Sequence, residues 1–125
     1  MGARWFWKLA AAWAAIIFVL SSIPGRSFPQ SKLFGYDKVL HGTVYAVLGA
    51  LCFMAIRRTW VLRPHWLVVA AGAIALAYGL TDEFHQLFVP GRSADLMDVL
   101  ADGIGGLIGA VAGAVFPLAK PDRAS

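Results

Sequence analysis

Four stretches of the 125-residue chain contain no Asp, Glu, Lys or Arg, and they constrain its fold more than any other feature. They cover residues 9–25, 39–56, 64–81 and 103–119. At about 1.5 Å of rise per residue, each covers roughly 26 Å as a helix, close to the ~30 Å hydrocarbon core of a bilayer. A hydrophobic content of 59% also leaves too little polar surface for an ordinary soluble domain of this length. The sequence therefore predicts an all-α membrane protein, a compact bundle of four transmembrane helices.

We expect the chain to form a single domain, residues 1–125. Helix-breaking and charged residues bound its four predicted spans, which lie at about 6–23, 38–56, 65–83 and 97–117. Pro24-Gly25 follows the first span, and Pro90-Gly91 follows the third. Arg57 and Arg58 stop the second span. We expect the third helix to continue past its apolar part through Gln86.

The basic residues in the short loops predict the orientation of the bundle. With the N-terminus inside, seven Lys or Arg lie on the inner side and four on the outer side, so both termini are predicted to be cytoplasmic. Six of the seven acidic residues then lie on the outer side. The bases form no stripe on one face, so the net charge of +4 does not indicate a nucleic-acid partner.

Three segments bring ionisable and polar side chains to the predicted outer end. Asp37, His41 and Tyr45 recur at i, i+4 and i+8 in the first segment, and the second is the polar run 82–86 (Asp-Glu-Phe-His-Gln). In the third, Asp98 and Asp102 share one face of the fourth helix. Ionisable groups at membrane depth cost about 2.5–3.5 kcal/mol each, so a cluster of them indicates a functional site. The residues that we expect to form a binding pocket are Lys38, His41, Tyr45, Asp82, Glu83, His85, Gln86, Arg92, Asp98 and Asp102.

A stripe of glycines continues the acidic face of the fourth helix. Gly105, Gly109 and Gly113 recur every four residues, and small residues at this spacing let membrane helices approach closely. We therefore expect this stripe to be a helix contact and the acids above it to point into the bundle.

A purely structural interpretation of the same residues stays open. Asp37 and Asp95 stand near helix starts, where a carboxylate caps the helix. The remaining acids could form an ion-pair network with Lys38, His41 and Arg92 that only fixes the helix register.

The arrangement resembles the VanZ-like family of small bacterial membrane proteins. The resemblance rests on the segment 37–41 (Asp-Lys-Val-Leu-His) with Tyr45, on the long segment 82–93 from Asp82 to Ser93, and on Asp95, Asp98 and the segment 102–106. It covers about residues 36–110. Asp102 departs from the family pattern, which commonly has asparagine at this place.

The resemblance implies a multi-pass protein of the bacterial cytoplasmic (inner) membrane, part of the cell envelope. The family is named for a member associated with glycopeptide antibiotic resistance, which does not imply that this chain confers resistance. We expect the outward-facing pocket to bind a lipid headgroup, a lipid-linked cell-wall precursor or another membrane protein. The small size favours a homo-oligomer or a partner.

The alternative is a membrane-embedded enzyme, a hydrolase or transferase acting on a lipid-linked phosphate substrate. In it His41 or His85 acts as general acid or base, while the acids orient the histidine or bind a divalent metal ion; these acids are Asp82, Glu83 and Asp98. Arg92 would hold the phosphate through its planar fork. No cofactor is assured, because no ligand spacing such as H-E-x-x-H is present.

Overall fold

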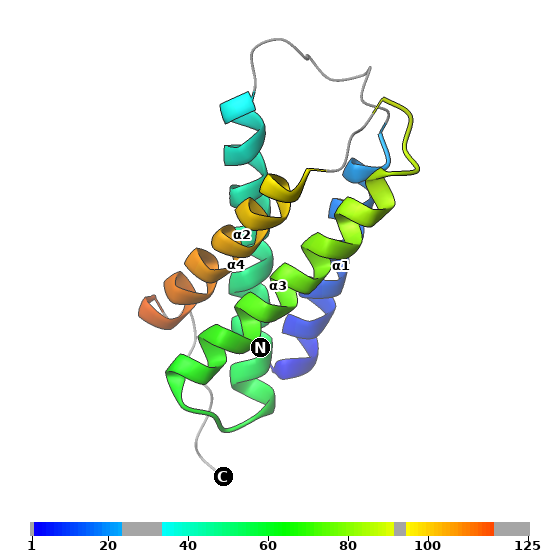
Figure 1. The fold of residues 1–125 in the computed structure, drawn as a ribbon. Helices are drawn as coiled ribbons and strands as arrows, with labels where there is room; N and C mark the ends of the chain where they lie inside the picture. The colour runs from blue at the N-terminus through cyan, green and yellow to red at the C-terminus, as the bar shows by residue number, and fades with distance from the viewer. Residues whose placement is uncertain (1, 24–33, 92–94, 117–125) are drawn as a thin grey trace.

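The structure is a computed structural model, and it describes residues 2–23, 34–91 and 95–116, with the side chains of 34–38 left out. It contains four helices in the order α1 (Ala3–Ser21), α2 (Phe34–Thr59), α3 (Pro64–Gln86) and α4 (Leu96–Val115). All four are long and apolar enough to cross a membrane. The expected four-helix membrane bundle is therefore confirmed (Figure 1).

Local sequence signals account for the helix ends. Pro64 occupies the first turn of α3, where its missing N–H costs no hydrogen bond. Asp95 precedes α4 and accepts a 2.9 Å hydrogen bond from the backbone N–H of Met97, so it caps this helix. After α3, Gly91 adopts a φ of 74°, a left-handed conformation that glycine enters without strain. As expected, α3 stays helical through Gln86.

Helices α2 and α4 cross in close contact along the predicted glycine stripe. A Cβ atom at Gly105 would overlap the backbone of Gly42, and one at Gly109 would overlap the carbonyl oxygen of Ala46. A Cβ at Gly113 would lie 3.0 Å from the ring of Phe53. The prediction that the stripe is a helix contact is confirmed, and it explains why α4 can carry its acids into the bundle.

Helix α1 lies at the periphery of the bundle. Only 17% of its spanning window is buried, against 50% for α4. Two hydrogen bonds join the middle of α1 to its neighbours: Trp13 donates to the carbonyl of Val44 in α2 (2.9 Å), and Tyr78 of α3 donates to the carbonyl of Ala14 (2.5 Å). Polar contacts therefore attach α1 where apolar burial is small.

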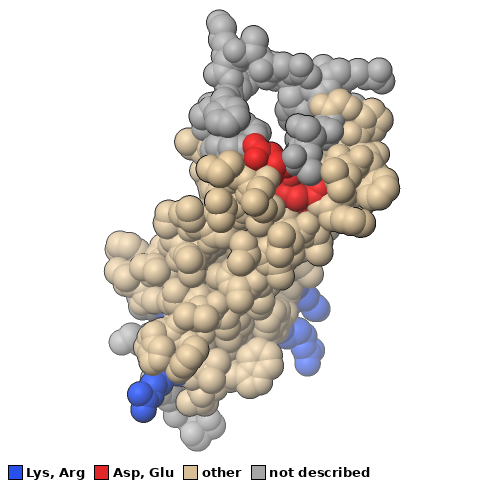
Figure 2. Space-filling model, in the orientation of Figure 1, with Lys and Arg blue, Asp and Glu red and all other residues tan. Residues whose placement is uncertain are grey.

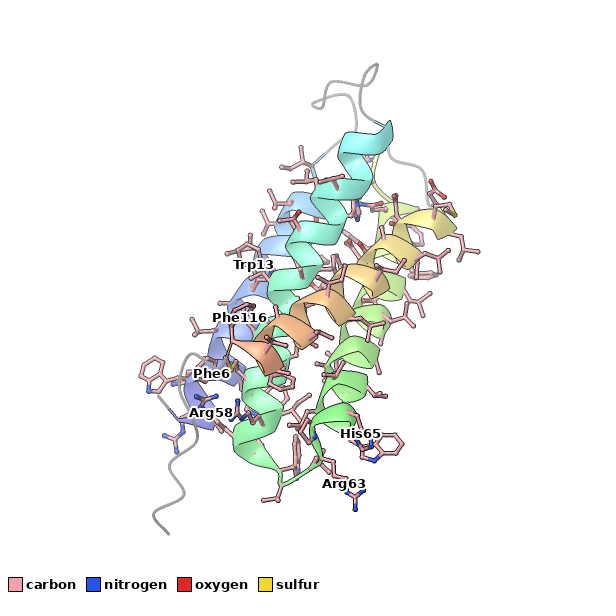
Figure 3. The ribbon with its side chains drawn as sticks, turned by 90° about the vertical axis from the view of Figure 1, so that its left-hand side faces the viewer. Phe6, Trp13, Arg58, Arg63, His65 and Phe116 are labelled. Atoms are coloured by element: carbon pink, nitrogen blue, oxygen red, sulfur yellow. The ribbon has the colours of Figure 1, made fainter. Side chains whose placement is uncertain are left out.

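Charged side chains divide between the two ends of the bundle (Figure 2). Every acid whose side chain is described lies at the end of α3, in the first two turns of α4 or directly before α4, at one end of the bundle. The described Lys and Arg side chains belong to the start of α1, the last turn of α2 and the α2–α3 connection, and Figure 3 places Arg58, Arg63 and His65 at that opposite end. This separation agrees with the predicted charge distribution, while the side of the membrane that each end faces stays a prediction.

Candidate functional site

Four helix ends meet where the acids gather: the end of α1, the start of α2, the end of α3 and the start of α4 (Figure 1). Four carboxylates are buried there, and their exposed fractions are at most 6%. These residues are Asp82, Glu83, Asp98 and Asp102. The side chains separate into two groups with different hydrogen bonding.

The first group, which we call the serine–aspartate group, consists of Ser21, Tyr45 and Asp82. The hydroxyl of Ser21 donates to Asp82 Oδ1, and the hydroxyl of Tyr45 donates to Asp82 Oδ2 at 3.2 Å. Both carboxylate oxygens of Asp82 therefore have a partner, and each partner comes from a different helix. This group ties α1, α2 and α3 together.

A second contact between α1 and α3 lies beside this group. Ser22 Oγ and His85 Nε2 are 2.9 Å apart, and the ring of Phe18 stacks on the imidazole with centroids 4.4 Å apart. The hydroxyl of Ser22 also bonds the carbonyl of Phe18. His85 is therefore held by α1 rather than by the acids of α4.

The other group, the histidine–carboxylate group, consists of His41, Glu83 and Asp102 from three helices. His41 Nδ1 lies 2.9 Å from Asp102 Oδ1, and one ligand atom from each of the three residues falls within 4.8 Å of the others. Glu83 Oε2 accepts a 2.7 Å hydrogen bond from the backbone N–H of Asp95. The side chain of His41 is 13% exposed, while Asp102 is fully buried.

Two oxygens of the histidine–carboxylate group lack a hydrogen-bond partner among the described residues: Glu83 Oε1 and Asp102 Oδ2. Leaving a buried polar atom unpaired costs about 1–3 kcal/mol, and more when it is charged. Such atoms are rare in folded proteins and call for an explanation such as an ion or a ligand.

Gly79 provides the space for the Asp102 carboxylate. A Cβ at Gly79 would lie 2.9 Å from both Cβ and Oδ2 of Asp102, closer than real Cβ contacts allow. Gly79 precedes Glu83 by about one helical turn, so both lie on the same face of α3. On this face the Asp102 carboxylate packs against Gly79, and the Glu83 carboxylate follows one turn later. A small residue at this position is what lets the acids of α3 and α4 share one site.

The structure brings most of the predicted pocket residues to this end but does not unite them. His41, Glu83 and Asp102 lie together, whereas Tyr45 and Asp82 belong to the serine–aspartate group. Gln86 and Asp98 are buried at the same end. Arg92 and the side chain of Lys38 lie outside the described residues, so the predicted network with these cations stays a prediction.

Sequence reasoning missed the two serines at the end of α1. Ser21 and Ser22 contact Asp82 and His85, although the first span contributed nothing to the predicted pocket. The available signal was their position, since they are adjacent hydroxyl residues at the end of an apolar span that reaches the acidic side. Asp95, for which capping had been one interpretation, is a helix cap.

The chemistry open to the histidine–carboxylate group follows from its atoms. An imidazole and two buried carboxylates can exchange protons, accept hydrogen bonds from hydroxyl or ammonium groups, or coordinate a divalent cation. The carboxylates act mainly as hydrogen-bond acceptors. No Lys or Arg is among the described side chains at this end of the bundle.

This fold and site define a class: a small four-helix membrane protein with buried carboxylates gathered at one end of the bundle. A comparison with family models identifies the family as VanZ/LLP1, with a match over residues 5–117. The match covers most of the chain, which therefore belongs to the VanZ/LLP1 family, as the resemblance in its motifs implied. No curated protein and no solved structure matches the chain.

Proposed function

We propose that the acid-bearing end of the bundle binds the polar headgroup of a membrane lipid or lipid-linked cell-wall precursor. The observation that carries the proposal is the pair of buried carboxylate oxygens on Glu83 and Asp102 that have no hydrogen-bond partner in the part of the chain that the structure describes. A structural network gains stability by pairing such atoms, whereas a binding site keeps them available for a ligand.

An apolar groove beside the histidine–carboxylate group supports a lipid as the ligand. The groove lies between α2 and α4, has a volume of about 480 Å³, and is lined by residues that include Gly42, Ala46, Ala101, Ile104 and Ile108. Gly42 follows His41 in α2, and Ala101 precedes Asp102 in α4. Both helices that line the groove are long and apolar enough to cross a membrane, so the groove would face the acyl or isoprenoid chains of the surrounding lipids. One amphipathic molecule can therefore place its chain in the groove and its headgroup at the carboxylates.

The experiment is lipid analysis of the protein purified gently from its native membrane. We expect one lipid class to be enriched over the bulk membrane extract and to be lost in the double variant Glu83→Gln/Asp102→Asn. Asp95→Asn is the matched control, because asparagine caps a helix as well as aspartate does. Identical lipid profiles for the wild type and the double variant would overturn the proposal.

We further propose that the site faces the outside of the bacterial cytoplasmic membrane. The support is the excess of basic residues at the opposite end of the bundle, which favours the cytoplasmic side. Reporter fusions after Arg58 and Arg92 should report opposite sides of the membrane, with Arg58 inside. A cytoplasmic report at Arg92 would contradict a headgroup site in the outer leaflet.

The second candidate function is an enzyme acting on a lipid-linked phosphate, and the proximity of His41, Glu83 and Asp102 favours it. Catalysis predicts turnover of the retained lipid, whereas binding alone predicts that the lipid is recovered intact. Incubation of purified protein with the enriched lipid, followed by mass analysis, separates the two functions. Substrate turnover that the double variant abolishes would establish the enzyme.

A further inference from the structure

We propose that His41, Glu83 and Asp102 bind a divalent transition-metal ion, Zn²⁺ or Mn²⁺. The proposal deepens the headgroup site above and rests on it only for the role of the ion, not for its binding. Three observations carry it: the ligand geometry, the two unpartnered oxygens and the charge balance of the acid-bearing end.

The geometry suits an ion held by three protein ligands. One ligand atom from each residue lies within 4.8 Å of the other two, and the residues come from three different helices. Neighbouring ligands of a tetrahedral zinc, bound at 2.0–2.2 Å, are about 3.4 Å apart. The 2.9 Å contact of His41 Nδ1 with Asp102 Oδ1 is a hydrogen bond, which leaves the other oxygen of Asp102, Oδ2, to the ion.

The unpartnered oxygens indicate that the ion binds at the histidine–carboxylate group and not at the serine–aspartate group. Asp82 lies next to Glu83 in α3 and is equally buried, yet both of its oxygens accept hydrogen bonds. Glu83 and Asp102 each keep one buried oxygen without a partner among the described residues. A coordinated cation would use these oxygens, and it would remove the cost of their burial.

The charge balance also favours a cation. Four carboxylates are buried at this end, and the described cationic candidates there are His41 and His85. Buried charges are normally paired or coordinate metals, and a divalent ion would offset the charges of Glu83 and Asp102, each of which keeps one oxygen without a partner among the described residues. An ion that keeps a coordination position open can also bridge the protein to an oxygen of a phosphate headgroup.

The mixed donor set narrows the identity of the ion. Imidazole nitrogen suits zinc and other transition metals, while two carboxylates also suit manganese. Magnesium and calcium prefer sites built from oxygen alone. We therefore expect Zn²⁺ and Mn²⁺ to bind more tightly than Mg²⁺ or Ca²⁺.

The test is calorimetric titration of Zn²⁺ and Mn²⁺ into the purified, chelator-treated full chain in detergent. We expect one ion per chain in the wild type and in the control Asp95→Asn. Glu83→Gln, Asp102→Asn and His41→Gln should each weaken binding by more than roughly 100-fold, because changes outside the ligand shell alone cost about 10–100-fold. Equal affinity in the wild type and the three variants would overturn the proposal.

A spectroscopic measurement on the wild type protects the test against variants that fail to fold. Electron paramagnetic resonance of the Mn²⁺-loaded protein should show hyperfine coupling to one imidazole nitrogen, which only a histidine ligand produces. Manganese bound without nitrogen coupling would overturn the His41 assignment and the site as proposed.

The two proposals fail in different ways. If metal binding is lost in the variants but the lipid profile never differs from bulk membrane, the metal site stands and the headgroup site falls. If the lipid is enriched and chelation does not release it, the ion plays no part in headgroup binding. If calorimetry detects no ion while lipid enrichment depends on Glu83 and Asp102, the metal site falls and the headgroup site stands.

Discussion

The serine–aspartate group and the histidine–carboxylate group occupy the same end of the bundle but differ in how their carboxylates are satisfied. In the first, hydroxyls from α1 and α2 donate hydrogen bonds to both carboxylate oxygens of Asp82. In the second, Glu83 and Asp102 keep one buried oxygen each unpaired among the described residues. Burial of an acid in this bundle therefore does not by itself indicate a binding site. An acid whose two oxygens are both paired with hydroxyls, as in Asp82, instead links neighbouring helices.

The largest expected effect comes from separating α2 and α4. Gly109→Leu should destabilise the fold by at least about 3 kcal/mol, the upper end for overpacking, because backbone rather than side chain must move away. His41 and Asp102 would then part, while the contacts of Ser21 with Asp82 do not cross this interface. The measurement is thermal unfolding and size-exclusion behaviour in detergent.

Val111→Leu is the matched control for that variant, since Val111 is 48% exposed and lies outside the groove between α2 and α4. It should behave as the wild type. A stable, monodisperse Gly109→Leu protein would show that the contact between α2 and α4 does not support the histidine–carboxylate group.

The next effect tests the serine–aspartate group as a tie. Asp82→Ala should lower the free energy of unfolding by about 1–3 kcal/mol, because it leaves the buried hydroxyls of Ser21 and Tyr45 unpaired. Thr81→Ala is the control, since its hydroxyl bonds only a carbonyl of its own helix. Equal thermal stability of Asp82→Ala and Thr81→Ala would remove the distinction between the two groups.

A smaller change sharpens the same point. Tyr45→Phe removes one 3.2 Å hydrogen bond and keeps the ring in its buried place, so we expect a loss of about 1 kcal/mol or less. The variant should retain the wild-type metal affinity. A larger loss of metal affinity than of stability would join Tyr45 to the histidine–carboxylate group.

The smallest expected effect on stability belongs to two acids of the pocket predicted from the sequence, Glu83 and Asp98. Glu83→Gln and Asp98→Asn keep shape and hydrogen-bonding capacity while removing a buried charge, so their stability should stay within about 1 kcal/mol of the wild type. We expect both to lose function, which is measured as lipid retention and as complementation of whatever envelope phenotype a deletion strain shows. Stable variants that complement fully would favour the register-fixing network over a functional pocket.

The sequence by itself determined the fold class. Uncharged runs, proline and glycine breaks and the four-residue glycine spacing predict membrane helices and a close helix contact, because these signals depend on the bilayer thickness and on helical periodicity. Its motifs also indicated the family that the comparison established. Periodicity likewise placed Asp98 and Asp102 on the inner face of α4, where both are buried.

Only the tertiary structure decided which polar residues share a site. The helical spacing within α3 sets Asp82 and Glu83 on neighbouring positions, but it does not say that one meets Ser21 of α1 and the other the group formed with α2 and α4. Those partners depend on how the four helices rotate and approach one another. The missing side chains of Gly79 and Gly105 control this approach, because a Cβ there would meet Asp102 or the backbone of Gly42. Contacts between distant segments arise from packing, and local sequence patterns can show which face of a helix is inward but not which helix that face meets.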